Sequence, residues 1–391
     1  MGVKFPVERA EKRRFLLEAV ANVRDTLAAH AEEGETLRTL PPASVAALTD
    51  SGLFAMKCPA ELGGAEADPV TQIEVIEATS YIDPSAGWCL SICNGTVSVM
   101  GSCLPQEAIE RLFAGDRPPR VAGSLTPGKA IPVEGGYRVN GRWSWASGIR
   151  HAEWIGGLTS VELNGGGAAY PRMMVFPVAK AQIHDNWNVA GLKGTGSCDF
   201  SVTDLFVPEA FTFNMRTWEP KRGGPLYQLG LPGLVVNEMA GFALGVGRRA
   251  LDTIIDLAKT KRRGYGKQTP LAEREVFQRT IGECDLRLKA VRGLAFEVFE
   301  RAWATVCAGQ RPTPQLQVEM RTITTLVTDV ALDVTTKAFR YGAGSAIHLN
   351  NILQRCLRDL QVEAAHLFVS DSTYELYGQC LLGIREVDPM G

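Results

Sequence analysis

The chain has 391 residues, of which 45% are hydrophobic and 21% are charged, so it can bury a large core and fold as roughly two or three domains. Its formal net charge is −2 and no run of Lys and Arg exceeds three residues, which excludes the basic face that nucleic acids and anionic membranes require. The opening sequence MGVKFPVERAEKRRF lacks the apolar core of a signal peptide, and no uninterrupted apolar stretch approaches the roughly 18 residues of a membrane span. We therefore expect a cytoplasmic protein with no membrane or nucleic-acid partner.

The cysteine content and the short motifs exclude several kinds of chemistry. The nine cysteines contain no CxxC pair and mostly stand among apolar residues, which indicates free thiols in a reducing compartment. The sequence contains no HExxH motif and no Cys/His spacing that is typical of a metal site. The nucleophile motif GxSxG and the phosphate-binding motif GxxxxGKS are absent as well.

Residues 1–120 are predicted to form a helical domain. In the stretch 70–82 apolar residues recur near helical spacing, and Asp83-Pro84-Ser85 ends that helix and caps the next. The following stretch, 86–100, is apolar almost throughout, which predicts a helix that is buried on most sides.

The spacing of apolar residues changes near residue 121 and predicts a β-domain over 121–220. The sequence GGYRVNGRWSW alternates apolar residues, including Trp143 and Trp145, with polar or small ones, as a half-buried strand does. Glycine-rich turns, such as Asn164-Gly165-Gly166-Gly167, separate the expected strands. The further strands are expected at 153–162, 172–178 and 198–207. We expect a small antiparallel barrel or sandwich.

Residues 221–391 are predicted to form a four-helix bundle. The clearest helix is 316–334, where apolar residues recur in alternating steps of four and three and make one stripe. Long apolar helices of this kind fit the core of a homotetramer. The sequence therefore predicts an α+β protein with an N-terminal helical domain, a central β-domain and a C-terminal bundle.

Three motifs in this order resemble the acyl-CoA dehydrogenase fold over nearly the whole chain. The stretch 140–148, NGRWSWASG, is similar to the family's strand that ends beside the flavin ring. The stretches 191–197, GLKGTGS, and 202–208, VTDLFVP, resemble the strand–turn–strand that closes its β-domain. The stretch 262–266, RRGYG, is close to the segment that starts the loop between two long helices.

The segment 353–366 resembles one branch of this family, the two-component flavin-dependent monooxygenases. That resemblance implies an oxidoreductase that takes reduced flavin from a separate reductase. It implies that O2 forms a C4a-hydroperoxide on the flavin, which oxygenates a small hydrophobic substrate, expected to be aromatic. The substrate could also be a CoA thioester.

His366 is the residue expected to distinguish this branch from the dehydrogenases. The glutamate that removes a proton in many dehydrogenases has its place at Leu367, which cannot accept a proton. An alternative position on an earlier helix falls near Val235, also apolar, although a shift of three residues would bring Glu238 there. A histidine beside the flavin can donate or accept a proton near neutral pH. A core histidine satisfied by a backbone carbonyl is the structural alternative.

Ser147 and Trp145 are the residues expected at the flavin ring. The resemblance implies that the Ser147 hydroxyl or N–H reaches flavin N5 or O4, and a hydroxyl suits both redox states because it donates and accepts. It also implies that Trp145 packs against the ring. A turn serine before Gly148 and an apolar strand residue are the structural alternatives.

The remaining cofactor residues are implied by the same resemblance. Arg262 resembles an arginine that reaches the diphosphate of FAD across a subunit boundary, a contact that would not exist with FMN. Between reduced FAD and reduced FMN, FAD is slightly favoured. The glycine-rich segments would bring backbone N–H groups or a close backbone approach to the cofactor. These segments contain Gly194, Thr195, Gly196, Ser197, Gly342 and Gly344.

The substrate pocket is expected to be apolar. Its lining is expected to include Trp88, Val97, Val235, Phe242 and Leu367. Two other functions stay open, an acyl-CoA dehydrogenase or CoA-thioester oxidase and a non-catalytic flavin-binding homologue.

Overall fold

The computed structural model describes residues 2–162, 169–215, 217, 219–263, 269–384 and 388. The glycine-rich turn expected at 164–167 and most of the motif at 262–266 lie outside these residues. The chain divides into two compact units. Unit 1 comprises Met1–Asp68, Trp88–Val189 and Lys193–Leu231, and unit 2 comprises Pro69–Gly87, Ala190–Leu192 and Pro232–Gly391. The division into three domains stays a prediction.

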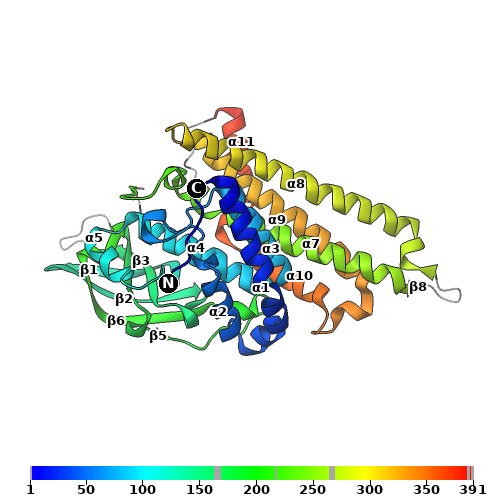
Figure 1. Ribbon diagram of the computed structural model, residues 1–391, viewed down its shortest axis with the longest axis horizontal. Coiled ribbons are helices and arrows are strands. Elements are labelled where there is room, and N and C mark those ends of the chain that lie inside the picture. The colour runs from blue at the N-terminus through cyan, green and yellow to red at the C-terminus, as the bar shows by residue number, and fades with distance from the viewer. Residues whose placement is uncertain are drawn as a thin grey trace. The chain divides into compact units, whose positions relative to one another are not determined.

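Unit 1 contains helices and one sheet. The helices are α1 (Arg9–Leu37), α2 (Pro42–Asp50), α4 (Pro84–Cys103, from Trp88 onward) and α5 (Gln106–Leu112). The strands are β1 (Val121–Val133), β2 (Gly136–Ala146), β3 (Trp154–Val161), β4 (Tyr170–Pro177), β5 (Gln182–Ile183), β6 (Cys198–Pro208) and β7 (Thr212–Asn214). They form one sheet in the order β5-β6-β2-β1-β3-β4-β7 (Figure 1). The strands expected from alternation are therefore confirmed.

The expectation of a purely antiparallel sheet was wrong for one pair of strands. β1 and β2 form an antiparallel hairpin around Gly135, whose φ of +75° suits the tight turn. The chain reverses again after β2, so β3 runs in the direction of β1 and pairs parallel to it on its other side. The sheet is therefore mixed.

A bulge near the end of β2 overturns the expectation that Trp143 and Trp145 share a face. The register between β2 and β6 shifts between Trp143 and Ala146. Trp143 is fully buried and stacks on Phe200, with ring centroids 5.1 Å apart. Trp145 has a φ of +64°, and its side chain is 69% exposed. The bulge therefore turns Trp145 out of the core.

Unit 2 is helical. Its helices are α3 (Pro69–Ile82), α7 (Asn237–Thr260), α8 (Glu275–Cys307), α9 (Pro314–Gly342), α10 (Ile352–Ala364) and α11 (Ser372–Leu382). Helices α7, α8 and α9 run side by side (Figure 1), α10 packs on α7 and α9, and the apolar stripe predicted at 316–334 is buried on α9. At Gly245 a Cβ atom would lie 2.2 Å from the Glu77 carbonyl oxygen, so this glycine lets α7 approach α3 closely. The predicted helical bundle is confirmed.

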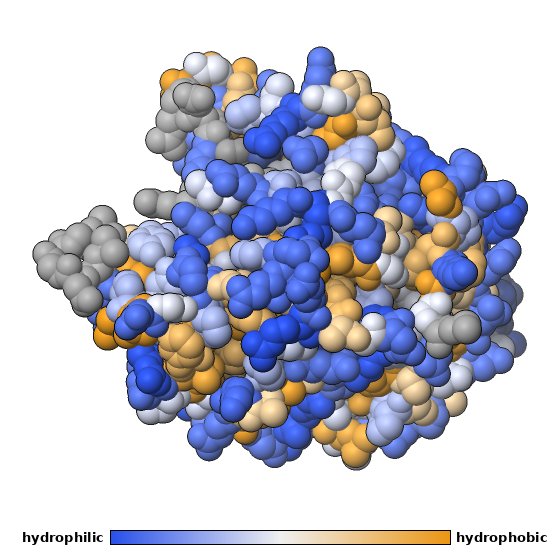
Figure 2. Space-filling view, turned by 60° about the vertical axis from the view of Figure 1, so that its left-hand side comes forward, coloured by the Kyte–Doolittle hydropathy of each residue, from blue (hydrophilic) through white to orange (hydrophobic). Residues whose placement is uncertain are grey.

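One apolar stretch, Gly230–Thr260, contains the short helix α6 (Gly230–Val235) and α7. By length and composition alone it could cross a membrane. Its most apolar window is 83% buried, which is typical of a core helix. Figure 2 shows one face of the molecule, on which hydrophilic residues separate small hydrophobic patches.

Candidate functional site

A buried cluster of hydroxyl groups follows the bulge in β2. The Trp88 indole N–H donates to Ser147 Oγ over 3.0 Å, and Ser147 Oγ lies 2.7 Å from Ser197 Oγ. Ser197 Oγ lies 2.7 Å from Thr195 Oγ1, and the Gly148 N–H donates to the Thr195 carbonyl over 2.9 Å. The four side chains of this cluster, Trp88, Ser147, Thr195 and Ser197, are buried in unit 1. Ser147, Thr195 and Ser197, which were predicted to bind the cofactor, therefore lie together with Trp88, which was predicted to line the substrate pocket.

Trp145 presents its ring to solvent only two residues before Ser147. The Ser147 N–H donates to the Trp145 carbonyl over 3.0 Å, which closes a tight turn. A bulky residue with positive φ is strained, and strain of this kind collects at functional sites. An exposed indole next to a buried hydroxyl combines a flat apolar surface with a hydrogen-bonding group. That combination fits a planar heteroaromatic ring such as a flavin.

The glycine-rich segment 193–197 contributes a tight turn to unit 1. The short 3-10 helix η5 (Lys193–Thr195) leads into Gly196, whose φ is +55° and whose absent Cβ would lie 2.9 Å from the Arg38 carbonyl oxygen. The Gly196 N–H donates to the Lys193 carbonyl over 3.4 Å. This glycine is therefore explained by the turn itself. The expected cofactor contacts of Gly194, Thr195, Gly196 and Ser197 stay predictions.

His366 lies in unit 2, where it precedes the short 3-10 helix η10 (Leu367–Val369). The Phe368 N–H donates to His366 Nδ1 over 3.3 Å, so the neutral ring carries its hydrogen on Nε2. Burial lowers the pKa of His366 to about 4, so the imidazole is uncharged at neutral pH. Arg321, buried on α9, donates to the Leu367 carbonyl over 3.2 Å. In this tautomer the Nε2–H group of His366 can act as a hydrogen-bond donor.

Two motifs that carried the family resemblance meet within unit 2. The Asp359 carboxylate on α10 accepts from the Leu192 N–H over 2.6 Å, and the Arg358 guanidinium donates to the Ala190 carbonyl. A Cβ atom on Gly191 would lie 2.2 Å from the Arg358 carbonyl oxygen, so only glycine fits there. Arg355, one turn earlier, donates to the Asp83 carboxylate over 3.0 Å. The polar side of α10 therefore holds the segment 190–192.

Two titratable residues with shifted pKa values, Glu363 and His151, were not predicted from the sequence. Glu363 on α10 is fully buried, and neither carboxyl oxygen has a hydrogen-bond partner among the described residues. Burial raises the pKa of Glu363 well above its usual range, because the apolar surroundings disfavour the charged carboxylate. Burial and the charge of Arg120 lower the pKa of His151, four residues after Ser147, to about 4. Glu363 has no sequence signal, because helical glutamates are mostly exposed.

The remaining cofactor residues lie in unit 2. Arg262 begins the short strand β8 (Arg262–Arg263), and its side chain is exposed. Gly342 ends α9, and a Cβ atom there would lie 2.7 Å from Ala346 and from Leu353. A Cβ atom on Gly344 would meet nothing within 4 Å. Close packing therefore explains Gly342 but leaves Gly344 unexplained.

The residues expected to line the substrate pocket lie in both units. Trp88 and Val97 belong to unit 1 and are buried on α4. Val235, Phe242 and Leu367 belong to unit 2; Phe242 is fully buried, Val235 is half-buried and Leu367 is 66% exposed. Their common pocket stays a prediction, as does the alternative base Glu238, which is buried on α7.

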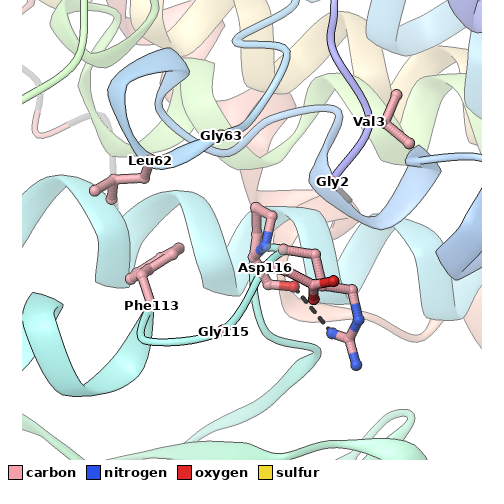
Figure 3. A pocket seen from close by; sticks show the side chains of 9 residues that line it. Gly2, Val3, Leu62, Gly63, Phe113, Gly115 and Asp116 are labelled. Carbon is pink, nitrogen blue, oxygen red and sulfur yellow. Dashed lines mark hydrogen bonds between the residues drawn. The ribbon is translucent and has the colours of Figure 1, made fainter.

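Two surface pockets of unit 1 contain none of the predicted site residues. The larger, about 310 Å³, lies between the N-terminal segment and the segment after α5 (Figure 3). The Arg117 guanidinium there donates to the Pro118 carbonyl over 3.1 Å and pairs with Glu153. The second, about 250 Å³, is lined by residues such as Arg172 and Glu209. Over the described ranges no group of His, Cys, Asp and Glu has the arrangement of a metal site.

Comparisons with known proteins agree with the resemblance. Residues 9–103 match the family described as acyl-CoA dehydrogenase, N-terminal domain, and residues 238–371 match its C-terminal domain. The chain is 32% identical to the indole-3-acetate monooxygenase of Pseudomonas putida, over 85% of this chain and 84% of that protein. It is 27% identical to HsaA of Rhodococcus jostii, the oxygenase subunit of a flavin-dependent monooxygenase, over 93% of this chain and 97% of that protein.

Solved structures share the fold. XiaF from a Streptomyces species, in complex with FADH2 and glycerol, superimposes with a TM-score of 0.89 at 24% identity and covers 98% of both chains. TdsC from Paenibacillus, in complex with FMN and indole, gives a TM-score of 0.82 at 18% identity, over 96% of this chain and 98% of that one. The chain belongs to the acyl-CoA dehydrogenase family, in its group of flavin-dependent monooxygenases.

Proposed function

We propose that this monooxygenase binds reduced FAD from a separate reductase and oxygenates a small aromatic substrate, with Trp145, Ser147 and His366 at the flavin. The observation that carries the proposal is the exposed, strained indole of Trp145 beside the buried hydroxyl of Ser147. When bound, the reduced flavin supplies two electrons to O2, so that one oxygen atom enters the substrate and the other leaves as water.

The side chains have separate tasks in this proposal. Trp145 covers one face of the ring, and Ser147 makes a hydrogen bond to its polar edge. His366 donates through Nε2 and stays neutral, which supports a role as a fixed donor rather than as a charged acid. Leu367 places no carboxylate at the position of the dehydrogenase base. The apolar side chains of Val97 and Phe242 favour an aromatic substrate.

The identity of the flavin rests on two kinds of support. XiaF holds FADH2 whereas TdsC holds FMN, so flavin chemistry is shared but the nucleotide differs between relatives. Arg262, which resembles a diphosphate-binding arginine, favours FAD.

The need for a reductase and the location of the protein belong to the same proposal. HsaA is the oxygenase subunit of its enzyme, which supports a separate reductase for this chain. All nine cysteines are free thiols, which suits the reducing cytoplasm where such a reductase works.

We also propose that the protein is a homotetramer. Large apolar side chains of unit 2 are exposed along α8 and at the C-terminal end of α11, where a second copy can cover them. They include Val276, Leu286, Leu294, Leu381, Leu382 and Ile384.

Incorporation of labelled oxygen tests the reaction. We would give the protein FADH2, isotopically labelled O2 and either indole-3-acetate or a simple phenol, and measure label in the product by mass spectrometry. We expect label in an aromatic product, and His366→Ala should lower product yield on the order of 100-fold while O2 is still consumed. His348→Ala, which changes an exposed histidine of unit 2, is the control.

A dehydrogenase would give the opposite result. It would be reduced by an acyl-CoA without O2, and it would put no labelled oxygen into any product. A non-catalytic flavin-binding protein would consume O2 without forming product from any aromatic compound tested.

A further inference from the structure

The two ends of the hydroxyl cluster are held by neighbouring residues of α4. The Trp88 indole N–H donates to Ser147 Oγ, and the Cys89 thiol donates to the Thr195 carbonyl over 3.6 Å. Trp88 is 6% exposed, and Ser147 and Ser197 are buried to a similar degree. Water therefore competes little for these hydrogen bonds.

The hydroxyl hydrogens of this cluster can be arranged in two ways. An indole N–H can only donate, so it always occupies one lone pair of the Ser147 oxygen. If Ser197 donates to Ser147, the second lone pair is filled too, and Ser147 can offer a ligand only its hydrogen. If Ser147 donates to Ser197, its hydrogen is used, and Ser147 can offer a ligand only a lone pair. Thr195 Oγ1 lies 2.7 Å from Ser197 Oγ, so it can complete either direction.

We propose that Trp88 is a positioning residue that, with Ser197 and Thr195, makes Ser147 either a pure donor or a pure acceptor toward the cofactor. This inference rests on the proposed contact between Ser147 and the flavin. Flavin N5 accepts a hydrogen bond in the oxidised form and carries a hydrogen in the reduced form. If the hydrogen bonds among these hydroxyl groups exchange donor and acceptor, Ser147 can bind both the oxidised and the reduced flavin without moving.

The test is a comparison of dissociation constants for oxidised and reduced FAD, measured by anaerobic titration of the whole protein. Trp88→Phe removes the N–H and keeps an aromatic ring. We expect it to weaken flavin binding about 2- to 10-fold, as the loss of one hydrogen bond does. It should also change the ratio of the two constants. Combined with Ser147→Ala, it should have no further effect on either quantity.

Thr195→Val adds a directional test with little change in shape. Without the Thr195 hydroxyl, Ser147 Oγ is the one hydrogen-bond partner left to the Ser197 hydroxyl among the described residues, so Ser197 donates to it and Ser147 becomes a donor toward the cofactor. We expect oxidised FAD to be bound more tightly relative to reduced FAD than in the parent protein. Trp154→Phe is the matched control for Trp88→Phe. It makes the same substitution in the same unit, at a ring that stacks on Phe211.

The outcomes separate the inference from the proposed function. If Ser147→Ala changes neither dissociation constant, the proposed contact of Ser147 with the flavin fails, and the inference fails with it. If Ser147→Ala weakens binding but Trp88→Phe has no effect, or has the same effect with and without Ser147, Trp88 acts only through packing and the inference alone is overturned. An unchanged ratio in Thr195→Val overturns the exchange of donor and acceptor in the same way. Circular dichroism of each variant checks that it folds.

Discussion

At the scale of single residues, the charge state of His366 decides which role it can have in the proposed site. Because its pKa is lowered to about 4 from the usual 6.5, the folded protein binds fewer protons than the unfolded chain between these values. The stabilisation from the neutral ring is present above pH 6.5 and is lost as the pH falls through about 4, with an upper limit of about 3 kcal/mol. We expect His366→Asn to remove that part of the acid destabilisation in urea unfolding. Equal pH dependence in both proteins would contradict the lowered pKa of His366.

The raised pKa of Glu363 leads us to expect the opposite dependence of stability on pH. Its pKa is raised, so its contribution to stability is present below the pKa of an unfolded-chain glutamate and is lost as pH rises through the folded value. We expect Glu363→Gln, which stays neutral, to unfold at higher denaturant concentration than the parent protein at alkaline pH. The gain should be on the order of 1–3 kcal/mol and should shrink toward pH 4. Glu375→Gln on α11 changes an exposed glutamate and serves as control. A gain that is independent of pH would show that Glu363 does not titrate.

Residue identities predicted part of this site. Ser147, Trp145 and His366 were predicted from their place in motifs that the sequence contains, and their roles at the flavin stay proposals. The hydrogen bond from Trp88 to Ser147 joins residues 59 positions apart, and no spacing rule connects them. Glu363 was missed because a glutamate inside an amphipathic helix is usually solvated, and only the packing of α10 on α7 and α9 buries it.

At the scale of elements, periodicity predicted which segments are helices and strands, and three-dimensional pairing decided the rest. The stripe on α9 and the alternation in β2 as far as Trp143 were confirmed because one buried face determines each pattern. Strand direction depends on how the chain turns after β2, so the parallel pairing of β1 with β3 could not be read from either strand. The bulge at Trp145 equally depends on the register with β6.

The segment 190–192 gives the element-scale prediction. Gly191→Ala would push a Cβ atom against the Arg358 backbone and disturb the bond from the Leu192 N–H to Asp359. We expect it to lower the free energy of unfolding by about 2 kcal/mol or more. Gly293→Ala on α8, where a Cβ atom meets nothing within 4 Å, should raise it by about 0.5–1 kcal/mol. Chemical denaturation of both variants measures the difference, and equal effects would contradict the close contact.

At the scale of the whole molecule, the exposed apolar side chains of α8 predict assembly of identical chains. Leu286 is 68% exposed and Leu294 is 46% exposed, on a helix that is otherwise rich in charge. Replacing both by glutamate should shift the mass measured by light scattering toward smaller species, because a charge in an apolar interface is not compensated. Glu283→Gln, on the same helix, is the control. An unchanged mass would place the interface elsewhere.

The proposed assembly and the proposed choice of FAD can be tested together through Arg262. If its guanidinium binds the diphosphate of FAD on another subunit, Arg262→Gln should weaken FAD binding about 10- to 100-fold, as the loss of a hydrogen bond to a charged group does. Reduced FMN has no diphosphate, so its affinity should change little. The smaller species formed by the double glutamate variant should show the same selective loss, because the donor and the bound FAD would then be on separate molecules. Titration of both flavins into both variants measures this, with Lys259→Gln as an exposed control. Equal losses for FAD and FMN would mean that Arg262 acts on something other than the diphosphate.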